Sequence, residues 1–147
     1  MSVEVLVPWR GGCPHREAAL EWVTARYPWP VTVAVCPPGD WCKARAVMPA
    51  VEASTADVLV VADADAWSDG TRAAVEAVED GFPWAMPHTR IVRLTQAATS
   101  EMLAGREPAE AYKVEERPYR GVMGGGITVL PRETYQQVPL DSRFTGW

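Results

Sequence analysis

The chain has 147 residues, 48% of them hydrophobic and 22% charged, which indicates one folded domain and excludes a disordered or fibrous chain. Its net charge of -5 makes nucleic acid an unexpected partner, because no broad basic surface can form. The three cysteines indicate reduced thiols rather than disulfides or a zinc site. Without a secretory signal or an apolar stretch of about 18 residues, no transmembrane segment is expected, and we expect a cytoplasmic protein.

The first 40 residues predict a strand, a helix and a second strand. The valine-rich run from Val3 to Val7 is expected to form a strand that stops at Pro8. From Pro14 to Tyr27, apolar residues recur at helical spacing. The stretch "PVTVAVCPPGD", residues 30–40, then predicts a short β-branched strand that is closed by prolines and a glycine.

The next 40 residues repeat the alternation. A helix is expected from Cys42 to Ser54, although Pro49 should kink it or delay its start to about Val47. The stretch "ADVLVVADADAW", residues 56–67, predicts a strand that is covered on both faces. A further helix is predicted from Thr71 to Glu79.

The second half of the chain is less regular. Residues 82–88 could form a strand, and residues 94–105 predict a helix that Gly105 ends. Residues 106–121 are polar and predict a loop. A glycine-rich turn, a strand from Ile127 to Leu130 and a helix from Pro131 are expected to follow.

The alternation of strands and helices predicts the fold class. Three repeats within about 80 residues favour an α/β fold with a doubly wound, mostly parallel sheet and helices on both faces. Ligands of such sheets bind beyond the carboxyl ends of the strands. Residues 8–12, 37–43 and 63–67 should therefore lie along one rim.

Two aspartates follow the predicted buried strand. Asp63 and Asp65 are separated by one small residue, and their carboxylates repel unless a cation or hydrogen-bond donors lie beside them. Hard oxygen ligands favour magnesium or manganese, which commonly bind together with the phosphates of a substrate. Aspartates are also common as turn and cap residues after strands, and that alternative stays open.

Four separated segments resemble the nucleotide-sugar glycosyltransferases of the GT-A fold, in particular their family-2-like and galactosyltransferase-like members. The segments are "VEVLVPWRG", "GDWCKARAVMPAVEASTADVLVVADADAW", "GGGITVLPRETYQQV" and "PLDSRFTGW". They are similar to the first strand, the Ala-Arg-Asn helix with the Asp-x-Asp strand, the Gly-Gly strand with its Arg-Glu helix, and the Phe-Asp-x-x-Phe-x-Gly-Trp element of this family. The resemblance implies a single Rossmann-like GT-A domain over residues 1–147, with a nucleotide-binding half (1–80) and an acceptor-side half (81–147).

The resemblance implies that a sugar moves from a nucleoside diphosphate donor, most simply a UDP-sugar, to an acceptor hydroxyl of a glycan, protein or small molecule. The reaction would be inverting and would use Mn²⁺ or Mg²⁺. Asp65 would bind the metal, and Asp63 the metal or the donor ribose.

Lys43 and Arg45 do not share a helix face, and Arg45 is expected to be the functional one. The implied donor-binding residues are Pro8, Arg10, Asp40, Lys43, Arg45, Asp63, Ala64 and Asp65, and the acceptor-side residues are Gly125, Gly126 and Trp147.

The sequence departs from the family pattern in two places. Ala46 stands where the family has the asparagine after Ala-Arg. The sequence stops at Trp147, where the family continues with a glycine and the Glu-Asp pair that supplies the general base. Glu133 and Asp141 are nearby acids but are more simply a helix-start and a turn residue, so no catalytic base is assigned.

Two alternatives therefore stay open. The first is a non-catalytic or truncated GT-A domain that binds a nucleotide-sugar without transferring it. The second is a nucleotidyltransferase, which also uses carboxylates at strand ends with magnesium. That class needs a lysine in the glycine-rich loop after the first strand, and "PWRGGCPHRE" has none.

Overall fold

The computed structural model describes residues 1–106, 112–116 and 125–145, with residues 112–116 described by their backbone alone. The chain forms two compact units, one made of Met1–Pro87 and Gly126–Trp147, the other of His88–Gly125. Each unit is described by itself below. The expectation of a single domain over residues 1–147 stays a prediction.

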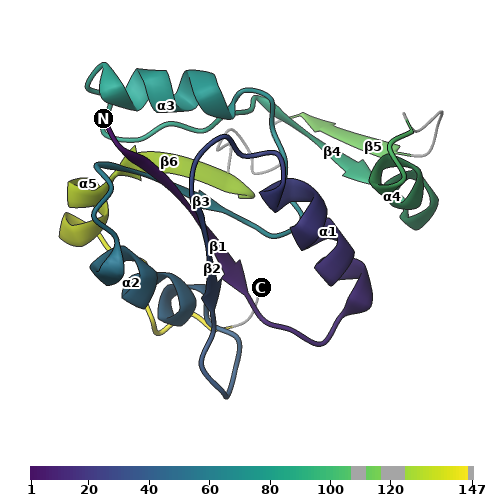
Figure 1. The fold of residues 1–147 in the computed structure, drawn as a ribbon, viewed down its shortest axis with the longest axis horizontal. Helices are drawn as coiled ribbons and strands as arrows, with labels where there is room; N and C mark the ends of the chain where they lie inside the picture. Colours follow the sequence, from purple (N-terminus) through teal and green to yellow (C-terminus); the bar gives the residue numbers. More distant parts are fainter. Residues whose placement is uncertain (107–111, 117–124, 146–147) are drawn as a thin grey trace. The chain divides into compact units, whose positions relative to one another are not determined.

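The first unit is built on a mixed sheet of four strands. Their order is β2-β1-β3-β6, and Figure 1 shows them side by side. The bounds are β1 Val3–Trp9, β2 Val31–Val35, β3 Val58–Ala62 and β6 Ile127–Pro131. β1 pairs in parallel with both β2 and β3, whereas β6 is antiparallel to β3. The predicted α/β class with a mostly parallel sheet is therefore confirmed.

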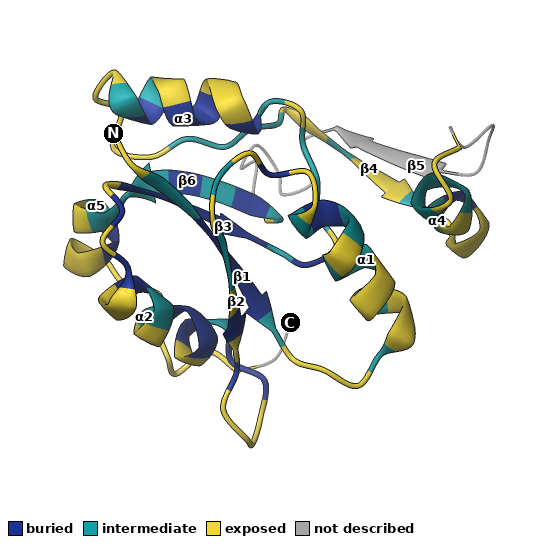
Figure 2. Ribbon diagram, in the orientation of Figure 1, coloured by how far each residue is buried: buried dark blue, intermediate teal, exposed yellow. Residues whose placement is uncertain are grey.

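Helices pack on both faces of this sheet, as the burial colours in Figure 2 indicate. Because side chains alternate along a strand, β3 sends Val60 toward one face and Leu59 toward the other. The first face packs against α3 and the second against α2 and α5. All five residues of β3 are buried, which confirms a strand covered on both sides. The helices of this unit are α1 Pro14–Thr24, α2 Lys43–Ala53, α3 Thr71–Glu79 and α5 Arg132–Gln137.

The first strand does not stop at Pro8, as the sequence had suggested, but continues to Trp9. The pairing of β1 with β3 ends at Leu6, while its pairing with β2 continues to Trp9. Val5 and Trp9 make their backbone hydrogen bonds on the β2 side of the strand. Because the direction of these bonds alternates along a strand, the nitrogen of Pro8 faces the β3 side, where pairing has already ended. Its missing N–H therefore removes no ladder hydrogen bond, and the proline is tolerated.

The second helix does not begin near Val47, as one reading of Pro49 allowed, but at Lys43. Pro49 removes the N–H that would bond to the carbonyl of Arg45, four residues earlier. Both residues are exposed, so water can satisfy that carbonyl. The opposite side of the helix buries Ala44, Val47 and Val51, and this packing maintains the helix through the proline.

The second unit contains a two-stranded antiparallel sheet and one helix. These are β4 Arg90–Leu94, β5 Tyr112–Glu116 and α4 Gln96–Leu103. The helix predicted within 94–105 is confirmed, and the Thr95 side chain caps it by accepting from the Ala98 N–H. The polar loop predicted for 106–121 is wrong at residues 112–116, which pair with β4 as a strand.

Residues 82–88 belong mainly to the first unit and do not form the strand that was considered for them. They contribute one isolated bridge, from Ala85 to Val129 of β6. Across all described residues, the longest helices are far too short and polar to cross a bilayer.

Candidate functional site

The sheet of the first unit reverses its strand order between β1 and β3. The chain leaves β1 through α1 to reach β2 on one side, then returns through α2 to β3 on the other side. At such a reversal the loops after the two strands diverge and leave a crevice at the carboxyl edge of the sheet. The segments that follow β1 and β3 are therefore neighbours at the position where this fold class binds ligands.

The turn after β3 holds both aspartates at this edge. The Asp63 N–H donates to the Gly126 carbonyl oxygen at 2.7 Å, and the Ala66 N–H donates to the Asp63 carbonyl oxygen at 3.1 Å. Ala64 is buried, with 2% exposure, and anchors the turn between the two acids. The backbone at Asp63 is consequently fixed on both sides, and both carboxylates remain accessible to solvent.

Each aspartate lies next to a cation from a different helix. The Lys43 Nζ lies 2.6 Å from Asp63 Oδ1, and an Arg16 guanidinium nitrogen lies 3.5 Å from Asp65 Oδ2. Lys43 is the first residue of α2, and Arg16 lies in the first turn of α1. Two acids and two bases thus gather where the loops of β1 and β3 meet.

Arg16 is absent from the set of residues predicted from the sequence. The rim segment predicted after the first strand covers residues 8–12 and ends before helix α1 begins. In an α/β unit the first turn of the next helix starts on the same rim as the loop. Extending the segment by one helical turn would have included Arg16.

Lys43 and Arg45 occupy different environments. Lys43 is half-buried and contacts Asp63, whereas Arg45 is exposed and its guanidinium lies beside Gly39 in the loop before α2. The resemblance to the family favours Arg45 instead. The geometry favours Lys43 as the cation next to the aspartates.

An aromatic cluster packs behind the aspartate turn. The Tyr27 ring centroid lies 5.1 Å from that of Trp67, and the Trp22 ring meets Trp67 edge-on at 6.2 Å. Burial first, and the negative charge of Asp63 second, raises the pKa of Tyr27 to about 12. The Tyr27 hydroxyl is buried and has no hydrogen-bond partner among the described residues. Burying a hydroxyl without a hydrogen-bond partner lowers the free energy of unfolding by about 1–3 kcal/mol. Within the described part of the chain, the Tyr27 hydroxyl is therefore an unused hydrogen-bond donor close to the aspartates.

The other residues predicted for the donor site lie along the same rim. Pro8 is buried in β1, Arg10 follows that strand, and Asp40 lies in the loop before α2. Arg10 and Asp40 are both exposed, and the described contacts bring neither of them to the aspartate pair.

Of the residues predicted for the acceptor side, Gly126 is tied directly to the aspartates. It has a φ of 80°, which favours glycine, and its carbonyl accepts from Asp63. A Cβ at this position would lie 3.3 Å from the Ala66 side chain, so any larger residue would also press on Ala66. Gly125 has a φ of 91° and belongs to the second unit. Trp147 lies outside the described residues.

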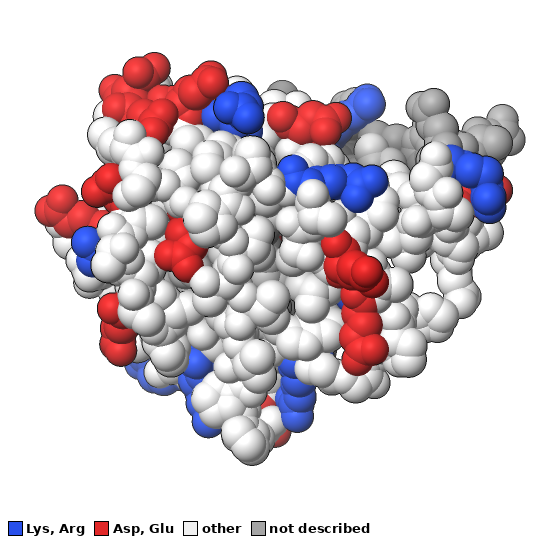
Figure 3. Space-filling view, viewed as in Figure 1, with Lys and Arg blue, Asp and Glu red and all other residues white. Residues whose placement is uncertain are grey.

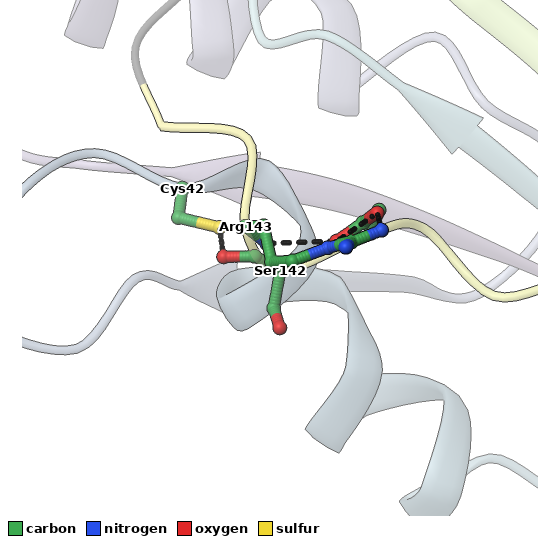
Figure 4. A network of polar contacts seen from close by, with 4 residues as sticks. Cys42, Ser142 and Arg143 are labelled. Atoms are coloured by element: carbon green, nitrogen blue, oxygen red, sulfur yellow. Dashed lines mark hydrogen bonds and ion pairs between the residues drawn. The ribbon is translucent and has the colours of Figure 1, made fainter.

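The segment after α5 is anchored at the start of α2. The Cys42 thiol donates to the Ser142 carbonyl oxygen at 3.6 Å, and Figure 4 shows the sulfur facing that oxygen. Arg143 bonds to Asp141, with a shortest distance of 2.6 Å, and these hydrogen bonds lower the pKa of Asp141. Asp141 is therefore already paired and matches its expected role as a turn residue.

Glu133 lies at the opposite edge of the sheet from the aspartate pair. β6 runs antiparallel to β3, so its end at Pro131 is level with Val58, the first residue of β3. Glu133 follows in the first turn of α5 and accepts from Gln137 Nε2 at 3.1 Å. Its position gives it no route to a substrate held at Asp63.

A cavity of about 580 Å³ lies at that opposite edge. Its charged groups are occupied by contacts within the chain: Asp57 accepts from Ser2, Glu79 lies 3.3 Å from the Met1 amino group, and Arg132 donates to the Ala56 carbonyl. Topology, rather than cavity volume, therefore points to the carboxyl edge.

Charges elsewhere on the first unit form no broad basic area in the view of Figure 3, where blue and red side chains are interspersed. Among residues 1–106 and 125–145, no three histidine, cysteine or acidic side chains gather as a complete metal cage. A metal at this site would therefore share its coordination with a ligand or water.

Compared with known proteins, the chain matches no family model and no curated protein.

Proposed function

We propose that the chain is a metal-dependent glycosyltransferase domain of the GT-A, doubly wound type, which moves a sugar from a nucleoside diphosphate donor to an acceptor hydroxyl with inversion. The observation that supports this function best is the pair Asp63 and Asp65 at the reversal of strand order, each beside a cation. The four segments that resemble the family contribute the specific choice of reaction.

The donor set fits Mn²⁺ or Mg²⁺. Both aspartates offer hard carboxylate oxygens, and both remain partly exposed, with side-chain exposures of 37% and 53%. The two carboxylates and the two cations, Lys43 and Arg16, balance one another. A divalent ion brought in together with the two negative charges of a donor diphosphate keeps that balance.

The residues of this chain would act mainly on the leaving diphosphate. Lys43 and Arg16 would offset the charge that develops on it, and the aspartates would hold the ion that supplies Lewis-acid stabilisation. The aromatic cluster of Trp22, Tyr27 and Trp67 would keep the aspartate turn rigid, which such preorganised catalysis requires.

One observation favours the second candidate, a domain that binds nucleotide-sugar without transferring it. Asp141 is paired with Arg143, and Glu133 lies at the opposite edge of the sheet. Neither residue is placed to take a proton from an acceptor hydroxyl. The base would have to come from another part of the protein, and without it the chain would bind the donor only.

Calorimetric titration with UDP tests the proposed function. We expect Mn²⁺ to strengthen UDP binding by about tenfold or more, because the aspartates would hold an ion whose charge attracts the diphosphate. Equal affinity with and without the ion would refute the site. Release of free sugar from UDP-sugars without an acceptor would then favour the enzyme, and tight binding without turnover would favour the binding domain.

A further inference from the structure

The ion pair between Lys43 and Asp63 joins a flexible side chain to a fixed one. The Asp63 backbone is held by hydrogen bonds to Gly126 and Ala66. Lys43 reaches its partner through a flexible four-carbon stem, so its ammonium group can move farther than the carboxylate on the short Asp63 side chain.

The base of that stem is itself fixed. Cys42, the residue before Lys43, is fully buried, and its thiol donates to the Ser142 carbonyl. Its backbone carbonyl accepts from the Cys36 thiol at 3.6 Å and from the Ala46 N–H at 3.2 Å. Movement is therefore confined to the Lys43 side chain, and its ammonium group can reach only anions near the start of α2.

Lys43 occupies a position where a cation needs a nearby anion. The N-terminus of a helix carries partial positive charge, which disfavours a lysine there. The first turn of α2 contains no acidic residue, and Asp63, on another element, supplies the compensating charge at 2.6 Å. A second anion at this edge would be an equally suitable partner for the ammonium group.

The pair is also weak enough to exchange. The Lys43 and Asp63 side chains are 36% and 37% exposed, so water and ions reach both groups. Exposed ion pairs of this kind change an affinity by only about two- to fivefold. A divalent cation that attracts the same carboxylate can displace the ammonium group.

We propose that Lys43 is an exchangeable counter-charge that couples metal binding to nucleotide binding at this site. Without metal, Lys43 neutralises Asp63. When a divalent cation takes the Asp63 carboxylate, the ammonium group is released and turns to the diphosphate of the incoming nucleotide. This inference rests on the proposed function and gives Lys43 a positioning role at the site.

The exchange has opposite consequences for the two ligands. Lys43 competes with the metal when nucleotide is absent, and it assists the nucleotide when metal is present. Because linkage is reciprocal, both effects raise the same coupling factor between Mn²⁺ and UDP. A lysine that only solubilises the surface would change neither affinity, and one that only stabilises the fold would not produce effects of opposite sign.

Calorimetry on Lys43→Met tests the exchange. We expect Mn²⁺ alone to bind about two- to fivefold more tightly than to the unchanged protein, and UDP in saturating Mn²⁺ to bind more weakly by a similar factor. Lys43→Arg keeps the charge and should restore both affinities in large part. Arg72→Met is the matched control: it removes one positive charge from an exposed position of α3, where the guanidinium lies 5.8 Å from the Trp29 ring, and should leave both affinities unchanged.

The outcomes separate this inference from the proposed function. If the unchanged protein shows no Mn²⁺-dependent UDP binding, the proposed function fails and the exchange fails with it. If that binding is present but Lys43→Met weakens both ligands, or alters neither, the exchange is wrong and the proposed function stands. Should Lys43→Met fold poorly by circular dichroism, Lys43→Gln provides the same test.

Discussion

Replacing Asp65 with alanine is expected to abolish the gain in UDP affinity that Mn²⁺ provides. We expect that gain to be about tenfold or more in the unchanged protein, and a tenfold change corresponds to about 1.4 kcal/mol. Asp65 is the more exposed of the two acids, and its ion pair with Arg16 is the longer one, so its carboxylate is the more accessible to a metal. Calorimetric titrations of Asp65→Ala with UDP, with and without Mn²⁺, measure the effect.

Asp80→Ala is the matched control for this change. It removes the same charge from an exposed carboxylate at the end of α3, next to residues that line the cavity at the opposite edge of the sheet. We expect its Mn²⁺-dependent gain to equal that of the unchanged protein. A gain that persists in Asp65→Ala, or that is lost in both variants, would show that the acids after β3 do not hold the ion.

Replacing Leu59 with alanine is expected to lower the free energy of unfolding by about 2–5 kcal/mol. Leu59 is the second residue of β3, is completely buried, and belongs to the cluster formed with Leu6, Val47, Val51 and Tyr135. The shortened side chain leaves a cavity between the sheet and α2 that rigid neighbours cannot refill. Urea unfolding followed by tryptophan fluorescence measures the loss.

Leu140→Ala provides the comparison for this stability effect. Leu140 is 39% exposed in the segment after α5, so the same truncation should cost well under 1 kcal/mol. Similar losses in both variants would mean that β3 is not the centre of the core. The predicted contrast would also confirm that the strand preceding the aspartates lies in the core of the first unit.

Periodicity in the sequence was sufficient to predict the main elements of the first unit. The run from Val58 to Ala62 is apolar at every position, which only a strand covered on both faces requires, and all five residues are buried. The helix Thr71–Glu79 was predicted with its correct bounds. At Pro8 the predicted end of the strand was wrong, because β1 no longer pairs with β3 there. At Pro49 only the later helix start near Val47 was wrong, because the buried face of α2 maintains the helix from Lys43.

The location of the candidate site was predictable, but its pairing was not. The rule that ligands bind beyond the carboxyl ends of parallel strands brought Asp63 to the same rim as Lys43. The choice between Lys43 and Arg45 depends on how far α2 is rotated about its axis, which the spacing of two charges does not determine. Arg16 was missed because its contribution comes from a tertiary contact to Asp65 and not from a pattern along the chain.

Paramagnetic broadening of backbone amide signals by Mn²⁺ tests the central claim most directly, because it locates the ion without relying on turnover. Substoichiometric Mn²⁺ should broaden the signals of Asp63, Asp65 and Lys43 first, while those of Glu79 and Glu133 beside the opposite cavity remain sharp. Broadening that begins at Glu79 and Glu133, or that spreads evenly over the protein, would contradict a metal site after β3.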